Sequence, residues 1–174
     1  MATKKSTLVL FGILVISAWV LGSAIQVGSE TLNYKIYTYG MKQEIMPIGD
    51  VEEHSLFFDV RRGFYVFENG EVATVNQVDN GEAVKGGASL LLYSTVTFPD
   101  GSTIITKSQG TLGAGVAGSA ATGGFKTEII KGTGRFEGIK GTASSKVKFT
   151  PLEKGEPGQK AVGEGTYTYT LPSK

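Results

Sequence analysis

The chain has 174 residues and nearly balanced charges, 17 Lys and Arg against 16 Asp and Glu, so it lacks the basic excess expected of a protein that binds nucleic acid. This length suits a single domain with one core. The absence of cysteine excludes disulfides, thiolate nucleophiles and cysteine-based metal sites, and the 25 glycines favour a sheet protein with tight corners.

An apolar N-terminal segment carries a targeting signal. Two lysines precede the apolar run of residues 8–21, and no charge follows until Glu30. One interpretation is a signal peptide cleaved after Ala24, where small residues precede the cut. The other is an uncleaved transmembrane helix of roughly 20 residues. Both place the lysines in the cytoplasm, so we expect residues 1–30 to export residues 31–174, either secreted or membrane-anchored on the extracytoplasmic (periplasmic) side.

Past this segment the hydrophobic period changes to that of strands. Leu32, Tyr34 and Ile36 alternate with polar residues, which predicts a half-buried strand. We expect residues 41–54 to be a connection, because they contain proline and glycine. Further strand-like runs lie at residues 55–60, 63–68, 72–78, 88–98, 103–111, 125–131, 142–149 and 161–171.

Short turn motifs separate several of these runs. Asn69-Gly70 lies between two apolar runs and predicts a type I′ hairpin, in which both residues have positive φ. The sequence DNG at residues 79–81 is expected to end the strand before it, and PDGS at residues 99–102 predicts another turn.

Two glycine-rich segments complete the pattern. Residues 132–141 place spaced glycines around one aromatic residue between two strand-like runs, which predicts a sharp corner. Residues 110–124 predict a strand edge and a flexible loop, or alternatively a loop that orders over a ligand. With about eight short strands and no amphipathic helix, the sequence predicts an all-β fold, an eight-stranded antiparallel up-and-down barrel preceded by one N-terminal hydrophobic helix.

Four motifs occur in a characteristic order: GDVEEH at residues 49–54, ENGEVA at 68–73, FPDGS at 98–102 and GTGRFEG at 132–138. In this order they resemble the allene oxide cyclase barrel, the calycin-like fold also used by plant dirigent proteins, in the form of a bacterial-type member of unknown activity. The resemblance implies an eight-stranded barrel, often dimeric or trimeric, with a lumen that holds an apolar ligand. Family members with known chemistry fold a reactive hydrophobic intermediate for cyclisation or coupling. The catalytic cysteine of the plant enzyme has no counterpart here, so no catalytic residue is carried over.

Asp59 and Arg61 are candidate acid, base or oxyanion groups. Residues two apart in a strand share a face, so both point into the lumen or both point away from it. Inside the lumen they have the chemistry of a general acid or base and its partner. The simpler interpretation is an ion pair between the two side chains.

Tyrosines are the candidates for a ligand pocket. Tyr34, Tyr93, Tyr167 and Tyr169 all fall in predicted strands. A lumen lined by tyrosine offers apolar surface and a few hydroxyl groups, which suits a small amphipathic or hydrophobic ligand. The alternative is an ordinary aromatic core or an oligomer interface.

Metal and cofactor chemistry are not indicated. The single histidine, His54, follows Glu52 and Glu53, which point to opposite faces of an extended segment, so we expect an exposed histidine and no metal site. The glycines of residues 132–138 lack the spacing and the helix of a phosphate loop, so we predict no nucleotide and no other cofactor.

The run at residues 88–98 is apolar on both faces, because Leu90 and Leu92 alternate with Leu91 and Tyr93. A core needs only one apolar face, so the other face predicts a partner, either a second copy or a membrane protein.

We therefore predict an exported, membrane-anchored or secreted barrel that acts as a binding or accessory module, such as a small extracytoplasmic subunit of a membrane complex. The alternative is a cyclase- or isomerase-type enzyme that confines a small hydrophobic substrate in the lumen. A third interpretation is a structural, self-associating protein. The sequence leaves open whether the protein is an enzyme.

Overall fold

The computed structural model describes residues 28–113 and 120–173. The predicted N-terminal helix, with its signal-peptide or anchor interpretation, lies outside these residues. The elements are β1 (Glu30–Pro47), β2 (Ser55–Phe67), β3 (Val72–Val84), β4 (Gly87–Thr97), β5 (Thr103–Gly113), β6 (Ala121–Gly132), the short 3₁₀ helix η1 (Gly134–Phe136), β7 (Lys140–Phe149) and β8 (Lys160–Thr170). No helix in the described part of the chain has the length and apolar character needed to cross a membrane.

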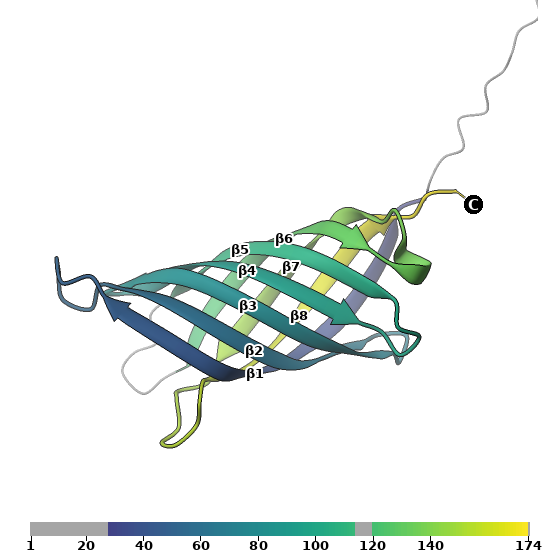
Figure 1. Ribbon diagram of the computed structural model, residues 1–174. Helices are drawn as coiled ribbons and strands as arrows, with labels where there is room; N and C mark the ends of the chain where they lie inside the picture. Colours follow the sequence, from purple (N-terminus) through teal and green to yellow (C-terminus); the bar gives the residue numbers. More distant parts are fainter. Residues whose placement is uncertain (1–27, 114–119, 174) are drawn as a thin grey trace, which may run out of the picture.

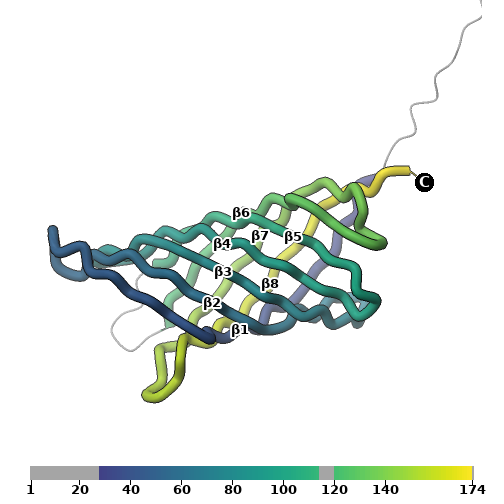
Figure 2. Tube along the Cα trace, in the orientation of Figure 1, coloured from purple at the N-terminus to yellow at the C-terminus, as the bar shows by residue number. Residues whose placement is uncertain are grey.

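The strands form one closed barrel. Each strand pairs antiparallel with the next, and β8 pairs with β1 (Figure 1). The predicted eight-stranded antiparallel up-and-down barrel is therefore confirmed. β1 begins and β8 ends at the same end of the barrel, where Glu30 is opposite Tyr169. Figure 2 follows the chain as it runs back and forth between the two ends.

Alternation along the strands decides which side chains fill the barrel. On β1, Tyr34, Ile36 and Thr38 are buried, whereas Lys35 and Tyr37 between them are exposed. The inward apolar side chains form two clusters. The larger cluster consists of Tyr34, Ile36, Tyr65, Phe67, Ala73, Val75, Val96, Phe98, Ile104, Ile129, Phe136, Ile139, Ala143, Tyr167 and Tyr169. The smaller cluster consists of Leu90, Leu92, Phe125, Phe149 and Ala161.

β1 is longer than predicted. The connection expected over residues 41–54 is wrong for its first half, because the chain continues as β1 and pairs with β2 as far as Pro47, opposite Ser55. A bulge at Met41 shifts the register at this point. A bulge adds one residue to the strand and reverses the alternation of faces beyond it, so the apolar pattern no longer reads as a strand.

The two runs predicted at residues 55–60 and 63–68 form the single strand β2. Gly63 interrupts the apolar pattern without interrupting the strand. β1 passes so close to it that a Cβ at this position would lie 1.9 Å from the carbonyl oxygen of Tyr37. The glycine is therefore a point of close contact between two strands.

The turns agree with the sequence in position more than in type. The hairpin at Asn69-Gly70 exists, but only Gly70 has positive φ, and its N–H donates to the carbonyl oxygen of Phe67 at 3.0 Å. This is the geometry of a type I turn followed by a left-handed glycine, so the type I′ prediction is wrong. β3 runs through residues 79–81, so the prediction that they end the strand is also wrong. The turn predicted at residues 99–102 is confirmed.

The glycine corner between β6 and β7 is confirmed. Gly134 has a φ of +61°, and η1 turns Phe136 inward until its ring centroid lies 4.7 Å from that of Phe98. Arg135 in the same turn donates from Nη2 to Glu71 Oε1 at 2.7 Å and ties the corner to the β2–β3 hairpin. The corner therefore closes the end of the barrel at which β1 begins and β8 ends.

Candidate functional site inside the barrel

Four polar side chains on β2 and β3 face the interior of the barrel. Asp59 and Arg61 share the inward face of β2, and Gln77 and Asp79 share that of β3. The register places Asp59 opposite Asp79 and Arg61 opposite Gln77. All four residues are buried, with exposed fractions between 1% and 7%. These four residues are named the lumen cluster below.

The lumen cluster has few bonds to the rest of the protein. Arg61 Nη2 donates to the carbonyl oxygen of Gln159 at 2.7 Å, and Gln77 Nε2 donates to Asp79 Oδ2 at 3.4 Å. Asp59 Oδ1, Arg61 Nε and Asp79 Oδ1 are buried and have no hydrogen-bond partner among the described residues. The simple ion pair between Asp59 and Arg61, the alternative drawn from the sequence, is absent from the ion pairs of the described residues.

Burial shifts the protonation of the lumen cluster. The pKa of Asp79 is raised from 3.8 to about 7, first by burial and then by the negative charge of Asp59. Burial also raises the pKa of Asp59, against the hydrogen bond from Gln43 and the charge of Arg61. The pKa of Arg61 is lowered by burial, which the two carboxylates oppose. The Asp79 carboxyl group is therefore only partly ionised near neutral pH, as in many acid–base sites.

A small cavity of about 40 Å³ lies beside the lumen cluster. Arg61 and Gln77 line it, whereas Asp59 and Asp79 do not. Its other polar lining residues all carry hydroxyl groups: Tyr34, Thr38, Tyr65, Ser94, Thr106, Ser108, Thr127, Ser145 and Tyr167. A polar space of this size holds a few water molecules, whereas sites for drug-sized ligands measure about 300–1,000 Å³. In the described part of the chain, side chains therefore fill the space for an apolar ligand that the family resemblance implies.

Aromatic rings of the smaller apolar cluster also border the cavity. Phe125 and Phe149 belong to that cluster and line the cavity. The guanidinium carbon of Arg61 lies 5.0 Å from the centroid of the Phe149 ring. A ligand larger than the cavity therefore has to displace these two rings.

Three of the four predicted pocket tyrosines point inward, and the fourth does not. Tyr34 lies between Tyr65 and Tyr167, with its ring centroid 4.8 Å from each of theirs. Burial raises the pKa of Tyr34 and Tyr167 well above the ordinary value, so both hydroxyl groups stay protonated. Tyr169 is buried in the larger cluster and does not line the cavity. Both faces of β4 are apolar, and the face that carries Leu90 and Leu92 points inward. Tyr93 therefore lies on the outer face, where it is 43% exposed.

Gln77 and Asp79 were not found from the sequence. The sequence of residues 79–81 predicts a turn, so Asp79 fell outside the strand predicted at residues 72–78 and Gln77 lay near the end of that strand. The signal that identifies them is their spacing from Ala73 and Val75, since all four residues alternate with exposed ones along β3.

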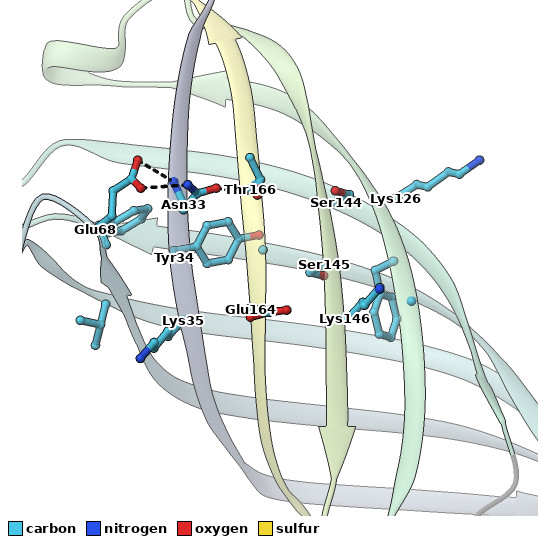
Figure 3. Close-up of a pocket in the computed structure, with 15 residues that line it drawn as sticks. Asn33, Tyr34, Lys35, Glu68, Lys126, Ser144, Ser145, Lys146, Glu164 and Thr166 are labelled. Carbon is cyan, nitrogen blue, oxygen red and sulfur yellow. Dashed lines mark hydrogen bonds between the residues drawn. The ribbon is translucent and has the colours of Figure 1, made fainter.

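A second concave surface lies outside the barrel, across β1, β8, β7 and β6 (Figure 3). It has a volume of about 970 Å³, and its charged lining residues include Lys35, Lys126, Lys146 and Glu164. They belong to β1, β6, β7 and β8. In Figure 3, Lys126 points away from the others. These charged side chains lie on the outer surface, whereas the lumen cluster is buried and its residues face one another across two neighbouring strands, so the lumen is the better candidate site.

His54 connects two elements and is partly buried, where the sequence leads to the expectation of an exposed histidine. Its Nδ1 lies 2.6 Å from Asp50 Oδ1 and its Nε2 lies 2.8 Å from Glu82 Oε1, with 14% of the side chain exposed. These hydrogen bonds raise the pKa of His54. Within residues 28–113 and 120–173, no group of three or more His, Asp or Glu side chains is arranged to hold a metal ion.

Two solved structures are similar to this chain. The pterocarpan synthase dirigent protein GePTS1 has 15% sequence identity and a TM-score of 0.47, over 92% of this chain and 98% of that chain. The pterocarpan synthase dirigent protein PsPTS1 has 14% identity and a TM-score of 0.47, over 84% of this chain and 97% of that chain. Comparison with protein-family models and with curated proteins gives no match, so membership of the allene oxide cyclase family is not confirmed.

Proposed function

We propose that this chain is an exported barrel that binds a small hydrogen-bonding molecule in its lumen and acts as a binding or accessory module. The observation that carries the proposal is the set of three buried polar atoms without a partner, Asp59 Oδ1, Arg61 Nε and Asp79 Oδ1. Each unsatisfied atom of this kind costs about 1–3 kcal/mol, and more if charged. A molecule that offers donors to the carboxyl groups and an acceptor to the guanidinium removes this cost.

The lumen cluster sets the class of ligand. Two carboxyl groups and one guanidinium favour a neutral or cationic molecule that has both hydroxyl or amine donors and a carbonyl or ether acceptor. A molecule of a few non-hydrogen atoms fits the cavity of about 40 Å³, where it contacts Arg61 and Gln77. Asp59 and Asp79 do not line this cavity, so a contact with their carboxyl groups requires the ligand to reach past those two side chains. A larger hydrophobic ligand requires Phe125 and Phe149 to move aside, because both rings line the cavity.

An NMR titration tests the lumen site. Protein labelled with ¹⁵N is titrated with acetamide, which fits the cavity, and with 1-hexanol, whose chain requires the rings to move. With at least one probe, we expect the Arg61 Nε–H and Gln77 side-chain amide signals to shift and the shifts to saturate. In the double variant Asp59→Asn/Asp79→Asn, the same probe is expected to produce no such shifts. Glu128→Gln, which removes an exposed carboxylate on β6, is the matched control. If neither probe produces a saturable shift of these signals, the site does not exist.

Export and membrane association belong to the same proposal. They are supported by the apolar run of residues 8–21 and the lysines before it. β1 begins at one end of the barrel, so a retained anchor would hold the barrel by that end. The other end would then be free to contact another protein of the membrane complex of which this chain is a subunit. Intact masses from native membrane and soluble extracytoplasmic fractions test this. A soluble chain that begins at Ile25 indicates cleavage, a full-length chain in membranes alone indicates an anchor, and a full-length cytosolic chain contradicts export.

A cyclase- or isomerase-type enzyme, in keeping with the allene oxide cyclase-like motifs, is the second candidate. The observation that favours it is the pKa of Asp79, raised to about 7 beside Arg61, which suits a general acid or base at neutral pH. The proton-abstraction probe 5-nitrobenzisoxazole tests for such a base. A lumen base predicts elimination that is faster than with Asp79→Asn and follows an ionisation near pH 7. Equal rates for the wild type and Asp79→Asn count against the enzyme.

A further inference from the structure

The second half of β1 has a free edge. β1 pairs with β8 only as far as Tyr39, opposite Lys160, whereas its pairing with β2 continues to Pro47. The bulge at Met41 marks the point at which β1 leaves β8. Within the described residues no strand pairs with the other side of residues 42–47, which are named the free edge below. Figure 1 shows this part of β1 and β2 projecting past the rest of the barrel.

The free edge is apolar as well as unpaired. Ile45 and Met46 are 60% and 66% exposed, and the adjoining outer face of β2 carries the exposed side chains of Leu56 and Phe58. A strand edge of this kind is a template for pairing with another strand. Pro47 has no N–H to donate and limits the usable edge on one side.

We propose that the free edge pairs antiparallel with the free edge of a second copy of this chain, centred on Gln43. Lys42 and Glu44 form an ion pair with each other within one copy. The edge is complementary to itself about Gln43, because in the pair Lys42 of each copy also comes opposite Glu44 of the other. Centring the pairing on Glu44 instead sets two glutamates opposite each other, which is unfavourable. Charge complementarity therefore selects both the occupant, a second copy, and the register.

Pairing about Gln43 also brings apolar groups together. A two-fold axis perpendicular to the sheet keeps the outer faces of both β2 strands, with Leu56 and Phe58, on the same side of one continuous sheet. The contact uses the same surface on both copies, so it closes at two and does not propagate. It does not use the lumen cavity. Asp79→Asn is expected to leave it unchanged, whereas Asp59 lies opposite Gln43 and is not a neutral control.

Charge reversal tests the register. Sedimentation velocity over a concentration series measures the dissociation constant of the dimer. Lys42→Glu and Glu44→Lys each set like charges opposite one another twice by symmetry, so each weakens the dimer roughly tenfold. The double variant Lys42→Glu/Glu44→Lys restores complementary charges and recovers the wild-type constant. A wild type that stays monomeric throughout, or a double variant no tighter than the single variants, overturns the proposal.

Cysteine substitution tests the contact directly, because the chain has no cysteine of its own. In Gln43→Cys the two Cβ atoms lie about 4.5–5.5 Å apart across the axis, and mild oxidation is expected to join the copies. Mixing Lys42→Cys with Glu44→Cys chains gives the same readout without altering Gln43, which lies opposite Asp59. Thr168→Cys, exposed on β8, is the control. Cross-linking no faster than in this control, or to another protein in place of a second copy, contradicts the proposal.

Discussion

Asp79 couples the stability of the barrel to pH. Its side chain is buried opposite Asp59, and its pKa is raised to about 7. The substitution Asp79→Asn keeps the shape of the side chain and removes the titrating proton. We expect the variant to be more stable than the wild type above pH 7 and close to the wild type near pH 4.

The magnitude follows from the difference in proton affinity between the two states. The carboxyl group has a pKa near 3.8 when the chain is unfolded and about 7 when it is folded, so the native state binds the proton more tightly. Between these values the wild type loses stability as the pH rises, because the unfolded state gives up its proton first. At about 1.4 kcal/mol per pH unit, the interval amounts to at most about 4 kcal/mol. Relaxation and water entry reduce this figure, so we expect an advantage of about 2–4 kcal/mol for Asp79→Asn at pH 8.

Urea unfolding between pH 4 and pH 8.5, at constant ionic strength, measures this difference. The free-energy difference between Asp79→Asn and the wild type is expected to be small at pH 4, to grow up to about pH 7 and to level off above it. Glu128→Gln removes an exposed carboxylate and is expected to show no such growth. The reasoning is refuted if Asp79→Asn is less stable than the wild type at pH 8, since ionised Asp79 would then be stabilised by Arg61. Equal pH dependence of the two proteins also refutes it.

Three further substitutions test other parts of the structure. Gly165→Ala is expected to cost about 1–3 kcal/mol, because its Cβ lies 2.5 Å from the ring of Tyr34; an unchanged urea midpoint contradicts this. Phe136→Ala removes the ring that closes one end of the barrel and is expected to cost about 3–5 kcal/mol in thermal or urea unfolding, whereas a loss below about 1 kcal/mol means that the ring is dispensable. Hydrogen bonds to Asp50 and Glu82 raise the pKa of His54 above its ordinary value. The protonated His54 side chain therefore stabilises the fold at low pH, and this stabilisation is lost as the pH rises through the raised pKa of the folded state. As the pH rises through the pKa of folded His54, amide exchange in residues 48–54, corrected for intrinsic rates, is therefore expected to accelerate in the wild type and not in His54→Ala. Identical exchange profiles for the two proteins would show that the contacts of His54 with Asp50 and Glu82 do not stabilise this segment.

Local patterns were sufficient to predict the barrel but not the limits of its strands. Alternation of buried and exposed residues identifies a strand whenever one face is buried, as for Tyr34 and Ile36 on β1. The bulge at Met41 breaks that alternation, and the turn-like sequence of residues 79–81 lies in the middle of a ladder. In both places pairing with a neighbouring strand outweighs the local preference, and no local pattern reports that pairing.

The candidate site was predictable in part. The two-residue spacing of Asp59 and Arg61 placed them on one face, and the structure turns that face inward. Tyr93 shows the limit of the same argument, because β4 is apolar on both faces and alternation does not say which face is inside. Asp79 enters the site only through the register that sets it opposite Asp59.

By itself, the sequence determined the all-β barrel architecture, the hairpin at residues 69–70, the turn at residues 99–102 and the glycine corner, because these depend on residues close together in the chain. The tertiary structure decided which faces point inward, how little space is left in the lumen and which part of β1 remains unpaired. These features depend on the register between strands and on closure of the barrel. Such long-range pairings are selected by the packing of the whole sheet, because a shift of one residue would turn every side chain of a strand to the other face.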